Sequence, residues 1–379
     1  MKRRTFIRCV GCTAAAVSML EPRLMPEYLR GFENACAFDF TRELSSVEAK
    51  YYKKLDGGGI ECGICPRHCR VTDLERGYCG TRENRADTYF TLTYGLPCAL
   101  NIDPIEKKPL FHYYPGTTAL SLATAGCNVN CKFCQNWEIS QSRPEQTDNM
   151  DISPRAMVDI AEKRSVPHIA YTYSEPIIFY EYMSDIARLG HEKGIKSVMI
   201  TGGYIEKEPL AELMPHLDAI KVDLKSIRED YYRDIVGGEL RPVLDALIQM
   251  RKAGMWVELV YLVVPTLNDT ETEFIELAGW IKTYLGVDVP LHFSRFYPQY
   301  LLKNLPPTPT KTLEKAHELC KAEGLNYVYL GNLPGHAAES TYCPGCGRVL
   351  IERRGYRIDR YDLDGNRCKN CNREIPGLF

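Results

Sequence analysis

The sequence lacks three features that would each indicate a particular class of protein. It has no uninterrupted apolar run long enough for a membrane-spanning helix, which needs about 20 residues. It has no excess of one charge: the net charge of −2 gives no strong signal for nucleic-acid binding. It has no evident internal repeat or low-complexity tract. What remains is an ordinary globular protein, and 379 residues predict two or three domains.

Cysteine, in contrast, is abundant, with 16 residues. Eleven of them fall into three tight clusters, whereas disulfide frameworks are typical of much shorter secreted chains. The clusters therefore indicate metal binding. The other five are Cys9, Cys12, Cys36, Cys98 and Cys320. We interpret Cys320 as a core thiol, because it lies on the apolar stripe of a predicted helix.

The N-terminus forms a separate segment. Lys2 to Arg8 read KRRTFIR and precede the short run CVGCTAAAVSML. Paired arginines, a following aromatic residue and a weak apolar run are typical of a twin-arginine (Tat) export signal. A basic, frayed N-terminus is the alternative. We predict a signal-like segment over residues 1–37.

The middle of the chain predicts an α/β fold. From about Thr117 to Asn332, seven strand candidates alternate with helix-like segments and short glycine-bearing turns. Ser153 and Pro154 mark the start of one such helix. This alternation favours a parallel sheet with helical crossovers, closed incompletely as a partial TIM barrel of the (β/α)6 type. A doubly wound open sheet is the alternative.

The cysteine clusters define the rest of the domain organisation. We predict an N-terminal cysteine-rich module over 38–110, a core barrel over 111–335 and a C-terminal four-cysteine ribbon over 336–379. The first module contains Cys62, Cys65, Cys69 and Cys79, and the ribbon contains Cys343, Cys346, Cys368 and Cys371.

The two outer clusters each hold enough thiolates to close a metal site. In the first, zinc and an auxiliary iron–sulfur cluster are both compatible with the spacing, and His68 could replace one cysteine. In the second, two C-x2-C pairs favour zinc, with rubredoxin-type iron as the rival. The basic, strand-like segment GRVLIERRGYRI between those pairs is either a solvated ribbon face or a docking surface for a macromolecule.

The central cluster holds only three cysteines. Cys127, Cys131 and Cys134 follow the first core strand with C-x3-C-x2-C spacing. Catalytic residues of βα barrels lie at this end of the strands. Three thiolates can hold three irons of a [4Fe–4S] cluster and leave the fourth open to a small molecule. Phe133 would supply an apolar wall; a zinc site with a ligand from elsewhere is the alternative.

This motif and its context resemble a known family. C-x3-C-x2-C with an aromatic residue before the third cysteine is similar to the radical S-adenosylmethionine (SAM) superfamily. The segments DPIEKKPLFHYYPG, CNVNCKFCQNW, YTYSEP and GNLPGHAAESTYCPGCG also resemble the AmmeMemoRadiSam enzymes, which are related to the pyruvate formate-lyase activating enzymes. The resemblance covers roughly residues 55–379.

The resemblance implies roles for matching residues. The three cysteines would bind the cluster, and the amino and carboxylate groups of SAM would chelate the open iron. Where relatives carry Gly-Gly-Glu, this chain reads YTYSEP, so Glu175 remains to accept the SAM amino group in a charge-assisted hydrogen bond. An acid that caps the following helix is the alternative.

Further cofactor contacts are implied at three other strand ends. Asp223 and Lys225 match an Asp-Leu-Lys beside the cofactor in activating enzymes, although an ordinary ion pair is the alternative. Glycines after Thr201 allow a close ligand or simply a turn, and His292 is either cofactor-adjacent or a core histidine. The residues expected at the cofactor are Phe133, Glu175, Thr201, Gly202, Gly203, Asp223, Lys225 and His292. No residue is assigned to the chemical step itself.

The resemblance further implies reductive cleavage of SAM to a 5′-deoxyadenosyl radical, which abstracts hydrogen from an unidentified substrate. A glycyl-radical enzyme activase is the first alternative, although CQNW departs from the Asn-Pro-Glu ending of those activases. A non-catalytic zinc-ribbon binding protein is the second. Implied partners are a low-potential electron donor of the flavodoxin or ferredoxin type, and AMMECR and Memo proteins or a protein substrate. Electron supply favours the cytoplasm, whereas the N-terminal segment allows export to the periplasm.

Overall fold

A computed structural model describes residues 44–379 of the protein. The predicted signal segment over 1–37, with Cys9, Cys12 and Cys36, lies outside the described residues. Within residues 44–379, no helix combines the length and apolar character that crossing a bilayer requires.

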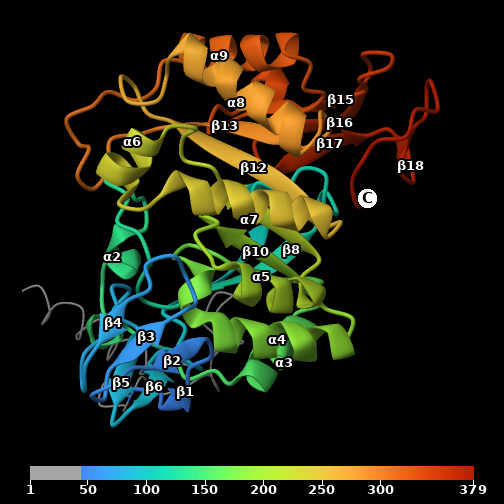
Figure 1. Cartoon of the computed structure of the whole chain (residues 1–379). Helices are drawn as coiled ribbons and strands as arrows, with labels where there is room; N and C mark the ends of the chain where they lie inside the picture. Colours follow the sequence, from blue (N-terminus) through green and yellow to red (C-terminus); the bar gives the residue numbers. More distant parts are fainter. Residues whose placement is uncertain (1–43) are drawn as a thin grey trace, which may run out of the picture. The chain divides into compact units, whose positions relative to one another are not determined.

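An eight-stranded sheet forms the centre of the fold (Figure 1). Its strands run in the order β14-β13-β12-β11-β10-β9-β8-β7, and all neighbouring pairs are parallel except β7 with β8. The bounds are β7 Ala99–Pro104, β8 Thr118–Ala123, β9 His168–Tyr171, β10 Lys196–Thr201, β11 Ala219–Asp223, β12 Trp256–Val263, β13 Leu291–Arg295 and β14 Val328–Gly331.

The strand order confirms a partial barrel. Neighbours in the sheet follow one another in sequence, whereas a doubly wound sheet reverses its order at a switch point. The two edge strands, β7 and β14, do not pair with each other. Each of the seven expected strands is present as one of β8 to β14. Strand β7 was not expected; it lies within the range predicted for the N-terminal module, yet it pairs along its whole length with β8.

Helices fill the six crossovers between the parallel strands. Ser153 Oγ accepts a hydrogen bond from Ala156 N at 3.2 Å, so the predicted helix start is confirmed. The longer helices are α3 Pro154–Lys163, α4 Tyr180–Glu192, α5 Lys207–Leu213, α7 Leu240–Lys252, α8 Glu271–Tyr284 and α9 Thr310–Ala322. Short turns of helix are α2 Trp137–Ser140, α6 Glu229–Tyr231, the π-helical η7 Tyr232–Val236, and the 3₁₀ segments η3 Ile105–Lys107, η4 Pro144–Gln146, η5 Pro176–Phe179, η6 Met214–His216 and η8 Ala337–Glu339.

Alternation along the strands separates an outer face from an interior. Tyr261 of β12 and Phe293 of β13 pack edge-to-face on Phe274 of helix α8, so they face the helices. Their neighbours in sequence therefore face the interior of the barrel. The core thiol predicted at Cys320 is confirmed, since it is fully buried in α9.

One end of the interior is closed by an apolar cluster. Ile105, Leu110 and Tyr113, which lie between β7 and β8, pack with Ala119 of β8 and Ala170 of β9. Leucine, isoleucine and tyrosine at these positions bury apolar surface that strands alone would leave in contact with water.

Small antiparallel sheets form the N-terminal module. One contains β1 Val47–Glu48, β6 Thr88–Thr91 and β5 Arg82–Arg85; the other contains β2 Tyr52–Lys54, β3 Ile60–Cys62 and β4 Arg70–Val71. Arg82 is fully buried and donates to both carboxylate oxygens of Glu181 in α4, at 2.8 and 2.7 Å. This ion pair fastens the module to the barrel.

The C-terminal residues form a four-cysteine module with two further sheets. Their strands are β15 Thr341–Tyr342, β16 Val349–Arg354 and β17 Arg357–Tyr361 in one sheet, and β18 Leu363–Asp364 and β19 Arg367–Cys368 in the other. Arg353 of β16 is buried and donates to the Phe111 carbonyl at 2.7 Å, and Tyr329 of β14 packs in the same cluster as Leu350. The described residues, 44–379, belong to one compact unit, and the boundaries proposed at 110/111 and 335/336 stay predictions.

Candidate functional site

The loop after β8 brings the three central cysteines together. Cys127, Cys131 and Cys134 lie within electrostatic range of one another. Burial raises the pKa of all three thiols, that of Cys131 to about 12. Cys131 is buried, and Cys127 and Cys134 are half-buried. A bound metal cation would favour the thiolate form that burial disfavours. The three sulfur donors therefore fit the iron of a cluster, which thiolates bind.

Close packing against the N-terminal module fixes this loop. Gly126 has φ +96°, and a Cβ there would lie 2.5 Å from Thr81 Cγ2 and 2.6 Å from the Cys79 carbonyl oxygen. Only glycine combines that backbone conformation with that approach. The side chain of Arg67 donates to the carbonyls of Asn128 and Gly237. The module and the cysteine loop are thus in direct contact.

Glu175 lies beside the end of β10. Its carboxylate accepts from Thr201 Oγ1 at 2.5 Å and from Gly202 N at 2.8 Å. The adjacent Gly203 has φ +74° and its amide donates to Thr201 Oγ1 at 2.9 Å. Burial raises the pKa of Glu175, and the two hydrogen bonds oppose that effect. The expected residues at 175 and 201–203 therefore form one group. Glu175 also caps η5, the role given above as the alternative, because its Oε1 accepts from Ile177 N at 3.4 Å. Its Oε2, which accepts only from Gly202 among these donors, retains a lone pair for another donor.

Asp223 and Lys225 form the second expected group. Lys225 Nζ donates to Asp223 Oδ2 at 2.9 Å, and its charge lies 5.9 Å from the ring centroid of Phe133. Lys221, which sequence reasoning missed, donates to the other oxygen of Asp223. Burial tends to raise the pKa of Asp223, but the two lysines lower it below its usual range. Lys221 and Asp223 lie two residues apart on β11 and so share one face, and this spacing is the signal that could have found Lys221.

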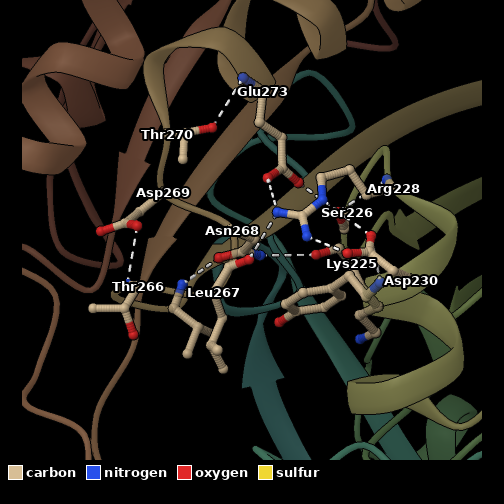
Figure 2. A network of polar contacts seen from close by, with 12 residues as sticks. Lys225, Ser226, Arg228, Asp230, Thr266, Leu267, Asn268, Asp269, Thr270 and Glu273 are labelled. Carbon is tan, nitrogen blue, oxygen red and sulfur yellow. Dashed lines mark hydrogen bonds and ion pairs between the residues drawn. The ribbon is translucent and has the colours of Figure 1, made fainter.

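A polar network behind Lys225 holds its backbone in place (Figure 2). Asn268 Nδ2 donates to the carbonyls of Lys225 and Leu262, both at 2.9 Å. Ser226 Oγ donates to the buried Glu273 of α8, whose own amide is capped by Thr270 Oγ1 at 3.2 Å. Sequence reasoning missed Asn268 and Glu273, although Thr270 to Glu273 has the spacing of a capping box.

His292 belongs to a different group of residues. Its Nε2 lies 2.8 Å from Glu258 Oε2, and its ring packs against Phe111 and Tyr329 at centroid distances of 4.7 and 4.9 Å. Glu258 also accepts from the backbone amide of Phe111 at 2.9 Å. These contacts tie β12 and β13 to the segment that closes the barrel, and none of them joins His292 to Glu175 or Asp223.

The first outer cluster lies next to the cysteine loop. Tyr78 N lies 3.4 Å from Cys69 Sγ, and Thr81 Oγ1 lies 3.2 Å from Cys79 Sγ. Cys62 and Cys65 are buried, and Cys69 and Cys79 lie within electrostatic range of both. His68 instead pairs with Glu206 at 3.1 Å. A cleft of about 730 Å³, whose lining includes Cys79 and Cys127, runs between module and loop.

The second outer cluster has the geometry of a site for one metal ion. The sulfurs of Cys343, Cys346, Cys368 and Cys371 all lie within 4.8 Å of one another. Two of the separations are 3.5 and 3.7 Å. A tetrahedral ion with metal–sulfur bonds of about 2.3 Å separates its sulfurs by about 3.8 Å. The four thiols can therefore bind a metal ion with little rearrangement.

Comparison with known proteins agrees with this arrangement. Residues 121–278 match the Radical SAM superfamily. The chain is 46% identical over 330 residues to the uncharacterized protein MJ0808 of Methanocaldococcus jannaschii, which covers 86% of this chain and 98% of that protein. It is 27% identical over 166 residues to a pyruvate formate-lyase-activating enzyme of Clostridium pasteurianum, which covers 43% of this chain and 69% of that enzyme.

Among solved structures, a radical SAM methyltransferase from Sphaerobacter thermophilus is similar over 86% of both chains, with 16% identity and a TM-score of 0.49. The residues that match the superfamily, 121–278, include the part of the barrel that carries the three cysteines, Glu175 and Asp223. The chain belongs to the radical SAM superfamily and is a radical SAM enzyme related to the activating enzymes.

Proposed function

We propose that Cys127, Cys131 and Cys134 bind the [4Fe–4S] cluster and that Glu175, Asp223 and Lys225 bind SAM. When bound, this cofactor pair supplies reductive cleavage of SAM to methionine and a 5′-deoxyadenosyl radical that abstracts hydrogen from the substrate. The observation that carries the proposal is the convergence of one buried and two half-buried thiols, a buried carboxylate and a half-buried lysine at one end of the barrel. The non-catalytic alternative does not apply to a radical SAM enzyme.

In this proposal the charged residues orient the methionine part of SAM. Glu175 accepts the ammonium group, since Thr201 and Gly202 hold its carboxylate in a fixed direction. Lys225 neutralises the carboxylate group, and Asp223 fixes the direction of Lys225. Phe133 keeps water from the thiols, because it is buried between the last two cysteines in sequence.

Reconstitution without oxygen tests this assignment. The wild-type chain with iron and sulfide should bind a [4Fe–4S] cluster whose electron paramagnetic resonance signal changes with SAM, and reduction should release 5′-deoxyadenosine. Cys131→Ser should abolish that release, whereas Cys98→Ser, a cysteine outside all three clusters, should retain it. Release by Cys131→Ser at the wild-type rate would overturn the proposal.

For the outer clusters we propose zinc at Cys343, Cys346, Cys368 and Cys371, and zinc or an auxiliary iron–sulfur cluster at Cys62, Cys65, Cys69 and Cys79. The sulfur separations in the C-terminal group support a single ion. Counts of zinc, iron and sulfide per chain distinguish the choices. Cys343→Ser should remove one zinc and no sulfide, and loss of sulfide with that variant would contradict the zinc assignment.

The relatives that are activating enzymes support a protein or peptide as the substrate. The four segments quoted above favour an AmmeMemoRadiSam-type enzyme with AMMECR and Memo proteins as partners and with a flavodoxin or ferredoxin as electron donor. Co-purification with the AMMECR and Memo proteins of the same organism tests that association. Failure of both to bind the wild-type chain would contradict it.

Activation of a glycyl-radical enzyme is the second candidate, favoured by the same relatives. Mixing the reduced, SAM-loaded chain with a candidate glycyl enzyme should then produce a protein-centred radical signal. A chain that cleaves SAM but produces no such radical signal with any candidate would exclude this function.

The predicted export signal at the N-terminus is tested separately. The test is a fusion of residues 1–40 to a reporter that is active only after export.

A further inference from the structure

The four cysteines of the first outer cluster lie on two turns of the N-terminal module that pack against each other. Cys62, at the end of β3, and Cys69, just before β4, stand opposite each other, since the Cys62 amide donates to the Cys69 carbonyl at 2.9 Å. Cys65 lies in the turn that joins them. The second turn carries Cys79, and the amide of Tyr78 in that turn lies 3.4 Å from Cys69 Sγ.

A buried hydroxyl lies beside these cysteines and has no acceptor in the chain. Tyr89 of β6 is fully buried, and its Oη forms no hydrogen bond within residues 44–379. A Cβ at Gly77 would lie 2.9 Å from this Oη and 3.7 Å from Cys69 Sγ, so the hydroxyl and the sulfur border the same space. A buried donor without an acceptor is unfavourable. The inorganic sulfide of an iron–sulfur cluster would supply an acceptor there, whereas a zinc ion brings none.

The spacing of the sulfurs also distinguishes the two outer clusters. In the second outer cluster all four sulfurs lie within 4.8 Å of one another, as they do around a single ion. No other three cysteines within residues 44–379 meet this limit. Thiolates that each bind a different iron lie farther apart than thiolates that share one ion. In spacing, the first outer cluster therefore resembles the three central cysteines.

A close contact joins the first outer cluster to the central cysteines. A Cβ at Gly126 would lie 2.6 Å from the Cys79 carbonyl oxygen, and Cys127 is the next residue. Thr81 reaches both sides, because its Oγ1 donates to Cys79 Sγ at 3.2 Å and its Cγ2 would lie 2.5 Å from the same Cβ. Cys79 and Cys127 also line one cleft of about 730 Å³. An electron thus has a short route between the two sets of sulfurs, through packed atoms and one peptide bond.

We propose that Cys62, Cys65, Cys69 and Cys79 bind an iron–sulfur cluster, the module cluster, which passes electrons to the central cluster at Cys127. The inference rests on the proposed function, because the acceptor is the [4Fe–4S] cluster proposed there. A reduced carrier protein of the flavodoxin or ferredoxin class gives one electron to the module cluster and is itself oxidised. The same electron passes to the central cluster and then to the SAM sulfonium, whose carbon–sulfur bond breaks to give methionine and the 5′-deoxyadenosyl radical. The module cluster is then oxidised again, so it is a relay.

Electron counting on the reconstituted full chain tests the inference. The anaerobic chain is reduced with titanium(III) citrate, the free reductant is removed by gel filtration, and excess SAM is added. Each reduced cluster holds one electron, so the wild-type chain should release about twice as much 5′-deoxyadenosine as Cys69→Ala, which keeps only the central cluster. The electron paramagnetic resonance signal of the reduced module cluster should disappear during the release. Cys98→Ala, which changes a cysteine outside all three clusters, should match the wild-type chain.

The outcomes separate this inference from the proposed function. A module-cluster signal that persists after SAM cleavage, or equal release by the wild-type chain and Cys69→Ala, would overturn only the relay. An iron and sulfide content that Cys69→Ala leaves unchanged would do the same. Absence of any release by the wild-type chain would contradict the proposed function and the relay together. A SAM-dependent change in the central-cluster signal of Cys69→Ala shows that this variant is folded.

A second variant keeps the test independent of the folding of Cys69→Ala. Tyr89→Phe removes only the unpaired hydroxyl. Because a hydrogen bond to sulfur stabilises the added negative charge of a reduced cluster, its loss should lower the midpoint potential of the module cluster and leave that of the central cluster unchanged. Tyr52→Phe is the matched control: the ring of Tyr52 lies 5.8 Å from that of Tyr89, but its hydroxyl donates to Glu48 at 2.6 Å. Equal module-cluster potentials in the wild-type chain and Tyr89→Phe would overturn the iron–sulfur assignment.

Discussion

The buried ion pair between Arg82 and Glu181 predicts how strongly the contact between the N-terminal module and the barrel stabilises the protein. Glu181 accepts from Arg82 at 2.7 and 2.8 Å and from the Lys50 amide at 2.7 Å. Glu181→Gln would remove the charge that pairs with a fully buried guanidinium and would place an amide NH₂ group against it. Removal of one partner from a buried ion pair costs about 3–5 kcal/mol. We expect a decrease of that size in the free energy of unfolding.

Glu212 supplies a matched control at the same contact between module and barrel. Its carboxylate pairs with Lys50 at 2.6 Å, and it also accepts from the Tyr51 hydroxyl, but both members of the ion pair are about half exposed. Exposed ion pairs contribute about 0–1 kcal/mol. Glu212→Gln should therefore change the free energy of unfolding by less than about 1 kcal/mol.

Urea unfolding of the metal-loaded chains at pH 7, followed by near-ultraviolet circular dichroism, measures both values. Because Gly126 contacts the Cys79 backbone, the Glu181→Gln chain should also lose cluster absorbance at a lower urea concentration than the Glu212→Gln chain. Equal stability of the two variants, within about 1 kcal/mol, would refute the reasoning that burial decides the strength of this contact.

Two further variants test the site, and a third tests the buried Lys108, whose ammonium donates to Asp103 at 2.6 Å. Glu175→Gln should weaken SAM binding at least about tenfold in equilibrium dialysis, because an ammonium loses its charged acceptor; an unchanged affinity would exclude the assigned role. Asn268→Ala should lower the free energy of unfolding by about 2–3 kcal/mol and also weaken SAM binding, since Lys225 loses a backbone contact. The half-buried Asp269 accepts from the Thr266 amide at 2.9 Å, and Asp269→Ala, which removes this bond, should leave SAM binding unchanged. Burial lowers the Lys108 pKa to about 8, so the unfolded chain binds more protons between pH 8 and 10.5 and stability contributed by this group rises with pH there. Urea unfolding at pH 8 and at pH 10.5 should show a rise of about 3 kcal/mol in the free energy of unfolding of the wild-type chain, and no such rise for Lys108→Met. Equal pH dependence in the two chains would contradict the assigned pKa.

The sequence predicted the features that depend on local patterns. Apolar runs between glycine-bearing turns gave the seven parallel strands, and Ser153 with Pro154 marked the start of α3, because strand and helix signals extend over only a few neighbouring residues. Cysteine spacing likewise identified the four-thiol group that is close enough for one ion.

Features that depend on contacts between distant residues were missed. The Tyr173 hydroxyl reaches Asp103 across 70 positions, and Arg82 pairs with Glu181 across 99. From the sequence alone, a lysine inside an apolar strand, such as Lys221, is expected to extend its ammonium group to solvent. Only the neighbouring strands of the sheet decide whether it does. Strand β7 was missed for the same reason, since only its pairing with β8 distinguishes it from a connecting loop.

The contact at Gly126 has a consequence for chain engineering. Thr81 and the Cys79 backbone occupy the space in which any other residue at 126 would place its Cβ. A chimera that joined this barrel to the N-terminal module of a relative would therefore also need the relative's residues at the cysteine loop around 126. The loop and the segment 79–81 would have to come from the same protein. In a double-mutant cycle, the effects on the free energy of unfolding of a substitution at 79–81 and one at 126 should therefore not be additive.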